Sequence, residues 1–404
     1  MRPLQERLTL EAAGEHHATT GVRTTANILV AAAALVVVVV ALGATAAPAR
    51  TTRPVILRWL QMVDEVHGYA LSGQDPAAYR LLRTNDGGRR WTDITPGAGA
   101  IHPNGPISVV GRTTMVFSTK LRKGVFAVER SDDGAHTWHR SLVFSDRRGQ
   151  GIGQPFAVDA RHLYVALDEG AAAGSQGQAL YTSSDGGHSW RFVSRTDVSR
   201  VRPRTLPFGC DKSGFGFSTP SRGWAGGYCA GGYPFFYRTD DGGHSWRRQS
   251  LSGVAQCACE VSAPRFFTPR IGGLYVMGFT MNGGGRPFLR VYWTRDGGTH
   301  WRASDPHAGR ATGAVSFADS RTAWVGANPP GGIRGPFNRL FRTSDAGRRW
   351  QTVKLPFDVE GYQLDAVSAT VAYALRAVDG SSSIRLTRDG GRSWQTIRAV
   401  GSGS

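Results

Sequence analysis

Helical periodicity and charged residues are both scarce in this sequence, and each shortage excludes a class of protein. No sustained helical pattern of apolar residues follows residue 50, which argues against a helical bundle. Charged residues make up only 19% of the 404 residues, whereas glycine (53) and tryptophan (11) are abundant. This composition is typical of a turn-rich all-β protein and excludes a disordered chain.

Lysine is also rare, so almost all of the basic charge is arginine. The only lysines are Lys120, Lys123, Lys212 and Lys354, which leaves 44 arginines among the 48 basic residues. The formal net charge is +18, and the whole excess lies from Arg50 onward because the earlier charges cancel. A GC-rich genome would explain the preference for arginine but not the net sign. Such a field attracts anionic partners.

Long apolar runs are absent except for one near the N-terminus. Residues 28–47 form 20 consecutive apolar or small residues, which matches the ~20 residues that a helix needs to cross a bilayer. We expect a transmembrane helix there, after a short polar segment (1–27) and before a linker (48–54). Ala44-Thr45-Ala46 is a candidate signal-peptidase site, so a secreted protein is the alternative. The run is longer than the usual ~7 to 15 apolar residues of a signal peptide, which favours a single-pass membrane anchor.

Cysteine is confined to one short region. Cys210, Cys229, Cys257 and Cys259 lie within 50 residues of one another, which indicates two disulfides in an oxidising compartment. Three pairings are possible. Cys210 and Cys229 flank two segments that we expect to be neighbouring antiparallel strands, which favours that pair. A metal site is the competing interpretation, but no histidine lies at ligand spacing beside the cluster, and we expect neither a metal nor a cofactor.

What the sequence has in abundance is a repeated turn motif, Ser/Thr-x-Asp-x-Gly/Ala-x-x-Trp. It occurs seven times, at intervals of 44 to 56 residues, and such intervals are typical of propeller blades. The motif aspartates are Asp86, Asp133, Asp185, Asp241, Asp296, Asp345 and Asp389. The closing tryptophans are Trp91, Trp138, Trp190, Trp246, Trp301, Trp350 and Trp394.

Each part of the motif has a structural explanation. Alternating apolar and polar residues flank it on both sides, so it is the turn of a β-hairpin. The carboxylate and the hydroxyl can bond turn amides that no strand reaches, glycine supplies a positive φ, and tryptophan anchors the turn. Ala135 replaces that glycine in the second motif, where we expect a slightly different turn. We therefore assign these residues a structural role, without calcium.

The repeats predict the architecture of the whole C-terminal region. In the sixth repeat we expect strands at 314–318, 322–327, 339–343 and 350–355. Seven such repeats fill residues 55–400, which predicts an all-β, seven-bladed β-propeller of four-stranded antiparallel blades behind one N-terminal transmembrane helix. We expect a monomer.

With a motif in every blade and the consensus Thr-x-Asp-Gly-Gly-x-x-Trp, the chain resembles the Asp-box (bacterial neuraminidase repeat) propellers. This family includes sialidases, xyloglucanases, sortilin-type receptors and the photosystem II assembly and stability factors. The resemblance covers roughly residues 55–400 and is closest to the assembly factors, which implies protein binding. The sialidase motif Phe/Tyr-Arg-Ile-Pro is replaced here by Arg53-Pro54-Val55-Ile56, so the resemblance does not extend to that active site.

If the motifs join the third strand to the fourth, the turns between the first and second strands share their face. The longer connections, including 170–178, then emerge on the opposite face, where we expect function to lie. Basic residues of the second to fourth blades should form one sector there, unless they are dispersed and solvated. These residues are Lys120, Arg122, Lys123, Arg147, Arg148, Arg195, Arg200, Arg202 and Arg204.

Two functions compete on that face. The favoured hypothesis is an extracytoplasmic, membrane-anchored binding or assembly propeller that recognises an anionic protein segment or envelope polymer; nucleic acid is disfavoured by the membrane segment and the cysteines. The alternative is a glycosidase, which needs two carboxylates, or a tyrosine nucleophile, in an axial pocket. A spacer domain without a ligand is a third possibility. The candidate catalytic residues of the glycosidase are Asp358, Glu360, Tyr362, Glu260, Asp168 and Glu169.

Overall fold

The computed structural model divides the chain into two units, 1–49 and 50–404, and only the second contains described residues. Within 54–401 it describes all residues except 75–78, 98–99, 102–106, 111–112, 145–148, 173, 197–203, 230–231, 282–284, 309–310, 329–335 and 379. The expected transmembrane helix at 28–47 lies outside the described residues, as do the segment 1–27 and most of the linker. Among the residues that are described, no helix is long and apolar enough to cross a membrane.

The described residues form six hydrogen-bonded sheets and no helix. In the first three sheets, strands that are close in sequence pair antiparallel, and the short strands β5 and β6 both pair with β7 as β10 and β11 both pair with β12. The first sheet contains β1 (Leu57–Met62), β2 (Gly68–Ser72), β3 (Arg80–Thr84) and β4 (Arg90–Asp93). The second contains β5 (Ala100–Ile101), β6 (Ser108–Val109), β7 (Met115–Arg122), β8 (Val125–Ser131) and β9 (His139–Phe144). The third contains β10 (Gly151–Ile152), β11 (Phe156–Ala157), β12 (Leu163–Ala172), β13 (Ser175–Ser183) and β14 (Arg191–Arg195).

The next sheet has nine strands and consists of two halves joined through β16 and β19. Its first half contains β15 (Asp211–Phe217), β16 (Gly223–Cys229), β17 (Phe235–Thr239) and β18 (Arg247–Arg248). Its second half contains β19 (Cys257–Val261), β20 (Arg265–Phe266), β21 (Gly272–Thr280), β22 (Pro287–Thr294) and β23 (Arg302–Ser304). Two four-stranded sheets follow: β24 (Ala311–Phe317), β25 (Ala323–Ala327), β26 (Arg339–Thr343) and β27 (Gln351–Lys354), and then β28 (Tyr362–Ala366), β29 (Ala372–Val378), β30 (Ser381–Thr387) and β31 (Gln395–Ile397).

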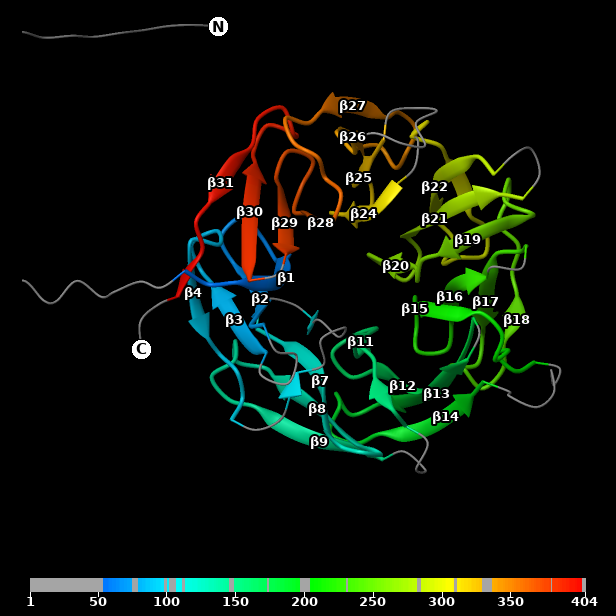
Figure 1. The fold of residues 1–404 in the computed structure, drawn as a ribbon. Coiled ribbons are helices and arrows are strands. Elements are labelled where there is room, and N and C mark those ends of the chain that lie inside the picture. Colours follow the sequence, from blue (N-terminus) through cyan, green and yellow to red (C-terminus); the bar gives the residue numbers. More distant parts are fainter. Residues whose placement is uncertain are drawn as a thin grey trace, which may run out of the picture. The chain divides into compact units, whose positions relative to one another are not determined.

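Within residues 54–401 the sheets stand in a ring, with strands such as β24 and β28 near its centre and β27 and β31 at its rim (Figure 1). Apolar side chains of adjacent sheets pack together and form the core. One such cluster joins Leu57 and Trp91 of the first sheet to Tyr373 and Leu386 of the last. This ring of twisted antiparallel sheets is a β-propeller.

The ring is closed at the rim by the C-terminal strand, β32 (Val400–Gly401). It pairs in parallel with β4, where Val400 lies opposite Arg90, so the first sheet gains a fifth strand from the other end of the chain. The sequence assigned residue 400 to the last blade and did not predict this pairing. The closure covers an edge of the sheet that would otherwise expose unpaired amides.

The predicted strands of the sixth repeat agree with β24 to β27 within three residues at each end. One expectation was wrong: 170–178 is not an irregular loop. Most of it belongs to a long hairpin, because β12 and β13 keep pairing, past a shift of register between Asp168 and Gly170, as far as Ala172 and Ser175. The hairpin is held by backbone hydrogen bonds between β12 and β13. Because such bonds do not depend on side-chain type, the glycine, alanine and polar residues of 170–178 did not predict it.

Candidate functional site

All seven turn motifs share three internal hydrogen bonds: the hydroxyl donates to the aspartate, the amide of the fifth residue donates to the hydroxyl, and the amide before the tryptophan donates to the aspartate. The indole bond is not shared, because Trp190 and Trp350 donate to Ser141 and Ser304 outside their motifs. In the fourth motif the Thr239 hydroxyl donates to the Asp241 carboxylate (2.7 Å) and accepts from the Gly243 amide (2.8 Å). The same carboxylate accepts from the Ser245 amide (2.8 Å), and the Trp246 indole donates to the Gly243 carbonyl (2.9 Å). Each aspartate is therefore occupied by its own turn.

These bonds favour the ionised form of the motif aspartates. Burial alone would raise the pKa of Asp296, but the amide and side chain of His300 lower it to about 2. In the last motif the Ser393 hydroxyl and amide hold the pKa of Asp389 at about 2. Ala135 keeps the left-handed backbone of the glycine that it replaces, with φ of 73°. The second motif thus has the same turn as the others, and its left-handed alanine makes that turn slightly strained.

The motif turns also define one face of the ring. The amide of the fourth motif residue donates to a carbonyl in the turn between the first and second strands, as from Gly186 to Arg161 and from Gly297 to Arg270 (both 2.8 Å). We call the face that carries these two kinds of turn the motif face. The turns between second and third strands, and the connections between sheets, lie at the other ends of the strands and make up the loop face.

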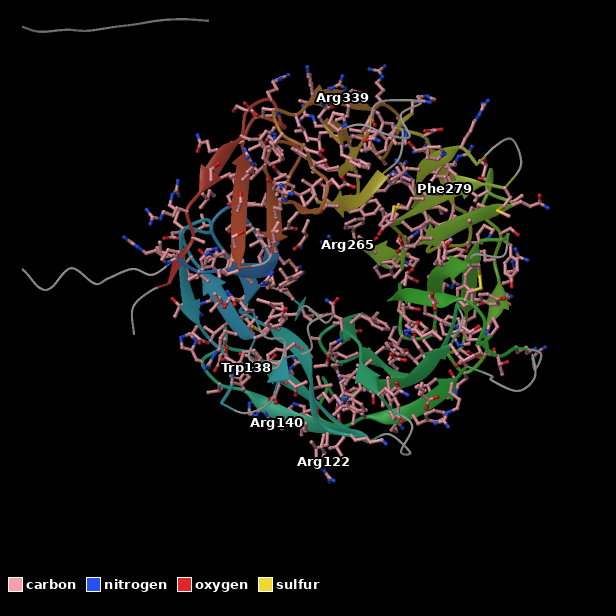
Figure 2. All side chains as sticks on the ribbon, in the orientation of Figure 1. Arg122, Trp138, Arg140, Arg265, Phe279 and Arg339 are labelled. Atoms are coloured by element: carbon pink, nitrogen blue, oxygen red, sulfur yellow. A yellow bond between two sulfur atoms is a disulfide. The ribbon has the colours of Figure 1, made fainter. Side chains whose placement is uncertain are left out.

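Four of the nine predicted basic residues, Arg147, Arg148, Arg200 and Arg202, lie outside the described residues. The other five are among the described residues, and they fall into two groups with different contacts. Lys120, Arg122 and Lys123 are exposed at the β7–β8 turn, and Lys120 donates to the Gln150 carbonyl (2.8 Å). Figure 2 shows Arg122 at the outer rim.

The remaining two described members of that set have structural contacts. Arg195 forms an ion pair with Glu169 (3.2 Å), so a predicted binding residue and a predicted catalytic residue contact each other. Arg204 is exposed, and its carbonyl accepts the Trp246 amide (2.9 Å).

The six candidate catalytic residues of a glycosidase are spread over three sheets. Asp358 accepts the amides of Phe337 (3.2 Å) and Glu360 (2.9 Å), while Glu360 itself is exposed. Tyr362 is only 7% exposed, and its hydroxyl accepts from Arg385 (3.4 Å). These contacts stabilise the connection between β27 and β28, and they leave no carboxylate beside the tyrosine hydroxyl.

Asp168 lines a cavity of about 530 Å³ at the loop-face ends of β10, β12, β13 and β15. We call it the Gln178 pocket; its polar side chains are those of Gln154, Asp168, Gln176, Gln178, Lys212 and Ser213. Asp168 is the only carboxylate that lines it, and this residue also accepts the Gly170 amide (2.9 Å). The Gln178 side-chain oxygen is buried and has no partner among the described residues. The pocket therefore offers hydrogen-bonding groups but no catalytic pair.

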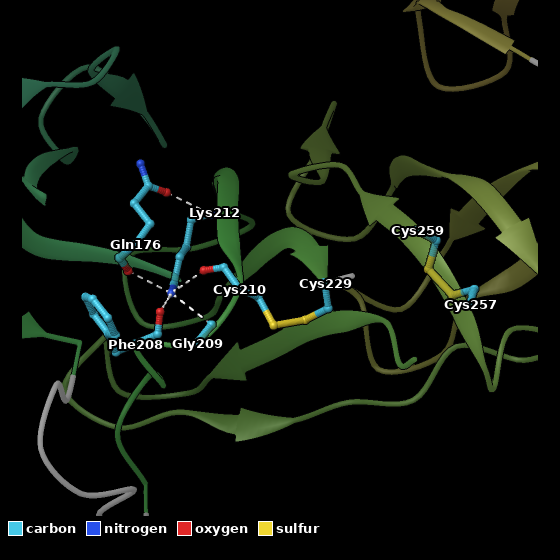
Figure 3. Close-up of a disulfide and its surroundings, with 8 residues drawn as sticks. All are labelled: Gln176, Phe208, Gly209, Cys210, Lys212, Cys229, Cys257 and Cys259. Carbon is cyan, nitrogen blue, oxygen red and sulfur yellow. Dashed lines mark hydrogen bonds between the residues drawn. A yellow bond between two sulfur atoms is a disulfide. The ribbon is translucent and has the colours of Figure 1, made fainter. Parts of the chain in front are cut away.

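Lys212 lies at the wall of this pocket and is held by four backbone carbonyls (Figure 3). Its ammonium nitrogen lies 2.9 Å from the carbonyl oxygen of Gln176, 2.7 Å from that of Phe208, 3.1 Å from that of Gly209 and 2.8 Å from that of Cys210. Burial lowers the pKa of Lys212 to about 7, although the nearby charge of Asp211 raises it. The side chain therefore fixes the backbone at the edge of the pocket.

The segment that Lys212 holds is also joined to β16 by a disulfide between Cys210 and Cys229. This is the pair that the neighbouring strands favoured, because β15 and β16 pair from Asp211 to Phe217. A second disulfide joins Cys257 to Cys259. Cys229 and Cys259 lie opposite each other where the two halves of the nine-stranded sheet meet.

Glu260 lines a different, smaller cavity of about 210 Å³ at the loop face. Its other walls are mostly apolar and include Tyr228, Met277 and Phe279. Tyr228 and Phe279 are 41% and 38% exposed, which is unusual for such large apolar side chains. Asp168 and Glu260 thus line separate pockets, so the structure does not combine them in one site.

A polar cluster at the centre of the ring was not predicted from the sequence. Gln363 and Asp365 on β28 accept the backbone amides of Leu60 (3.1 Å) and Met62 (2.5 Å) on β1. Burial raises the pKa of Asp365 to about 6, against the influence of the Met62 amide and of Arg265, which Figure 2 shows near the centre. Two polar residues at alternate positions of an otherwise apolar strand were the available signal. They join the last sheet to the first.

Comparison with known proteins defines the fold only. No family model and no curated protein matches the chain. It is similar to a family 74 xyloglucanase from Xanthomonas campestris (16% identity, TM-score 0.53, covering 86% of this chain and 54% of that one). It is also similar to a puromycin-hydrolysing peptidase from Mycobacterium tuberculosis (13% identity, TM-score 0.54, covering 85% of this chain and 53% of that one).

The chain therefore spans about half the length of these two enzymes. A third similar structure is YCF48 bound to a D1 peptide (15% identity, TM-score 0.45, covering 84% of this chain and 91% of that one). At such identities function does not follow from fold. The comparisons and the ring of antiparallel sheets together identify the described part of the chain as a β-propeller.

Proposed function

We propose that this chain is an extracytoplasmic binding propeller, held at the membrane by a helix at 28–47, which recognises an anionic protein segment or envelope polymer through its loop face. The observation that carries the proposal is the Gln178 pocket. Its polar lining, with one unpartnered amide oxygen and a single carboxylate, suits hydrogen bonding to an extended polymer and does not supply a catalytic pair.

The proposal includes a seven-bladed ring of the Asp-box family. Two observations support it. The nine-stranded sheet has two halves joined through only two residue pairs, Tyr228 with Glu260 and Cys229 with Cys259. Counting the halves separately gives seven groups of strands, each of which contains one motif turn. The disulfides support an oxidising compartment outside the cytoplasm.

Positive charge near the pocket supports an anionic ligand. The β7–β8 turn places three exposed cations on the loop face, and Lys120 contacts the carbonyl of Gln150, directly before the pocket residue Gly151. Arginine and lysine attract carboxylate and phosphate groups at long range, and pocket amides then select among them. We assign the steering to the turn and the selection to the pocket.

Fluorescence anisotropy with a labelled oligo-glutamate peptide tests the proposal. The variant K120E/R122E/K123E is expected to lose at least tenfold in affinity and most of the salt dependence, because it reverses the steering charge. The same outcome is expected for charge reversal at Arg147, Arg148, Arg202 and Arg204. Q178L should weaken binding while the salt dependence stays, since it removes a neutral hydrogen-bonding group.

A matched control carries the same charge change elsewhere. R90E/R191E/R392E alters three exposed residues within or directly after motif turns, at the motif-face ends of the outer strands β4, β14 and β31, and it should bind like the wild type. Equal losses in both triple variants would reduce the effect to net charge and contradict a loop-face site. Hydrolysis of a fluorogenic glycoside that disappears in D168N would instead favour the glycosidase.

A further inference from the structure

The motif face has a cleft that the proposed function does not use. It is a cavity of about 520 Å³ between the fifth and sixth motif turns. Four exposed arginines line it: Arg270 and Arg321 come from turns between first and second strands, and Arg295 and Arg348 from the motifs. Two neighbouring sheets thus direct positive charge into one cleft.

The lining of this cleft carries a net positive charge, because four arginines face a single carboxylate among the described residues that line it. Among the described residues, none of the four guanidinium groups forms an ion pair or a side-chain hydrogen bond. Asp345 is the one carboxylate in the lining, and it is occupied by the Thr343 hydroxyl (2.8 Å) and the Arg349 amide (3.0 Å) of its own turn. Like charges held together this way repel one another unless an anion lies between them.

The fourth motif has a carboxylate at its second position, where it neutralises neighbouring arginines. Its second residue is Asp240, which contacts Arg222 (3.2 Å), Arg238 (2.5 Å) and Arg247 (2.6 Å). In the fifth motif the second residue is Arg295, so the repeat places a cation where its neighbour has the neutralising carboxylate. Arg222 and Arg270 occupy equivalent turns, and only the first has a carboxylate partner in the described part of the chain.

We propose that this cleft is a binding site for a phosphate-bearing ligand. Guanidinium groups bind two oxygens of a phosphate at once, and four of them around one cleft match a doubly charged tetrahedral anion better than a single carboxylate. The site is independent of the loop-face function, since it lies at the other end of the strands. It also revises the expectation that function is confined to the face opposite the motifs.

Isothermal titration calorimetry with inorganic pyrophosphate on the full chain tests the site. R270Q/R321Q should weaken binding by tenfold or more, because it removes two charged hydrogen-bond donors from the cleft. The matched control R222Q/R247Q removes the same charge from paired arginines and should bind like the wild type. R321K, which keeps the charge but loses the planar fork, should give an intermediate loss.

Arg270 and Arg321 are exposed, so R270Q/R321Q and R321K should keep the urea midpoint of the wild type. Urea unfolding of these variants is measured in parallel. Absence of pyrophosphate binding by the wild type, or equal losses in both double variants, would overturn the proposal. Sedimentation with phosphatidylglycerol vesicles then separates two sources of the phosphate. Vesicle binding that R270Q/R321Q abolishes identifies a lipid headgroup, whereas pyrophosphate binding without vesicle binding identifies a soluble ligand.

Discussion

The motif face and the loop face are built from the same strands, yet they differ in what repeats. On the motif face one hydrogen-bond pattern recurs in every turn, and each carboxylate is occupied by amides of its own backbone. On the loop face the connections between second and third strands range from two residues at β7–β8 to eleven at β25–β26, and Lys212 at the start of β15 is buried beside a disulfide. The repeated residues therefore stabilise the ring, while differences between repeats, such as Arg295 in place of Asp240, are the places where a ligand can be recognised.

The largest expected effect is a difference in the free energy of unfolding between two variants. One removes a tryptophan anchor of the motif face, and the other removes an apolar residue of the loop face. W246A should lower the free energy of unfolding by about 3–5 kcal/mol, because this side chain is 3% exposed and its loss leaves a cavity. F279A removes a side chain that is 38% exposed and should cost less than about 0.5 kcal/mol. Urea denaturation of both variants measures the difference. Similar losses would show that the loop-face patch belongs to the core.

A smaller effect is expected where the loop face itself is held rigid. K212M should cost about 1–3 kcal/mol, since four partly buried carbonyls lose their donor. K120M is the control: the same change at an exposed lysine with one carbonyl partner should cost under about 1 kcal/mol. Thermal and urea unfolding provide the measurement, and an equal cost would contradict the anchoring role of Lys212.

Acid should weaken the motif face before the loop face. The folded-state pKa of Asp296 and of Asp389 is about 2, below the ordinary value of 3.8. Their contribution to stability is therefore present above about pH 4 and lost as the pH falls toward 2. D296N/D389N should flatten the decline of the urea midpoint between pH 4 and 2. An unchanged slope in this variant would assign the acid sensitivity to other groups.

The smallest effect should differ in sign between the two faces. A135G relieves a left-handed alanine in the second motif, so it should be neutral or stabilising by less than about 1 kcal/mol. A171G, in strand β12 near the loop face, should destabilise by about 0.5–1 kcal/mol because glycine weakens a strand. Paired urea curves resolve the sign, and stabilisation by both changes would contradict the comparison.

Local regularities made most of the fold predictable. The hydroxyl, aspartate, glycine and tryptophan of each motif interact within eight residues, so their spacing indicated the turns directly. The β32–β4 pairing joins residues 400 and 90, and the hydrogen bonds between β28 and β1 span about 300 positions. No local sequence pattern predicts contacts between residues so far apart. The Gln178 pocket depends in the same way on how adjacent sheets meet. Charge could be counted from the sequence, but its neutralisation by Asp240 could not.

The claim that the loop face binds an anionic segment is tested most directly by hydrogen exchange with and without the oligo-glutamate peptide, using R270Q/R321Q so that the motif-face cleft does not contribute. We expect the peptide to slow exchange in the β7–β8 turn and in the amides of 151–154, 176–178 and 212–215, with the seven motif turns unchanged. Protection confined to the motif turns, or none at any amide, would contradict the claim.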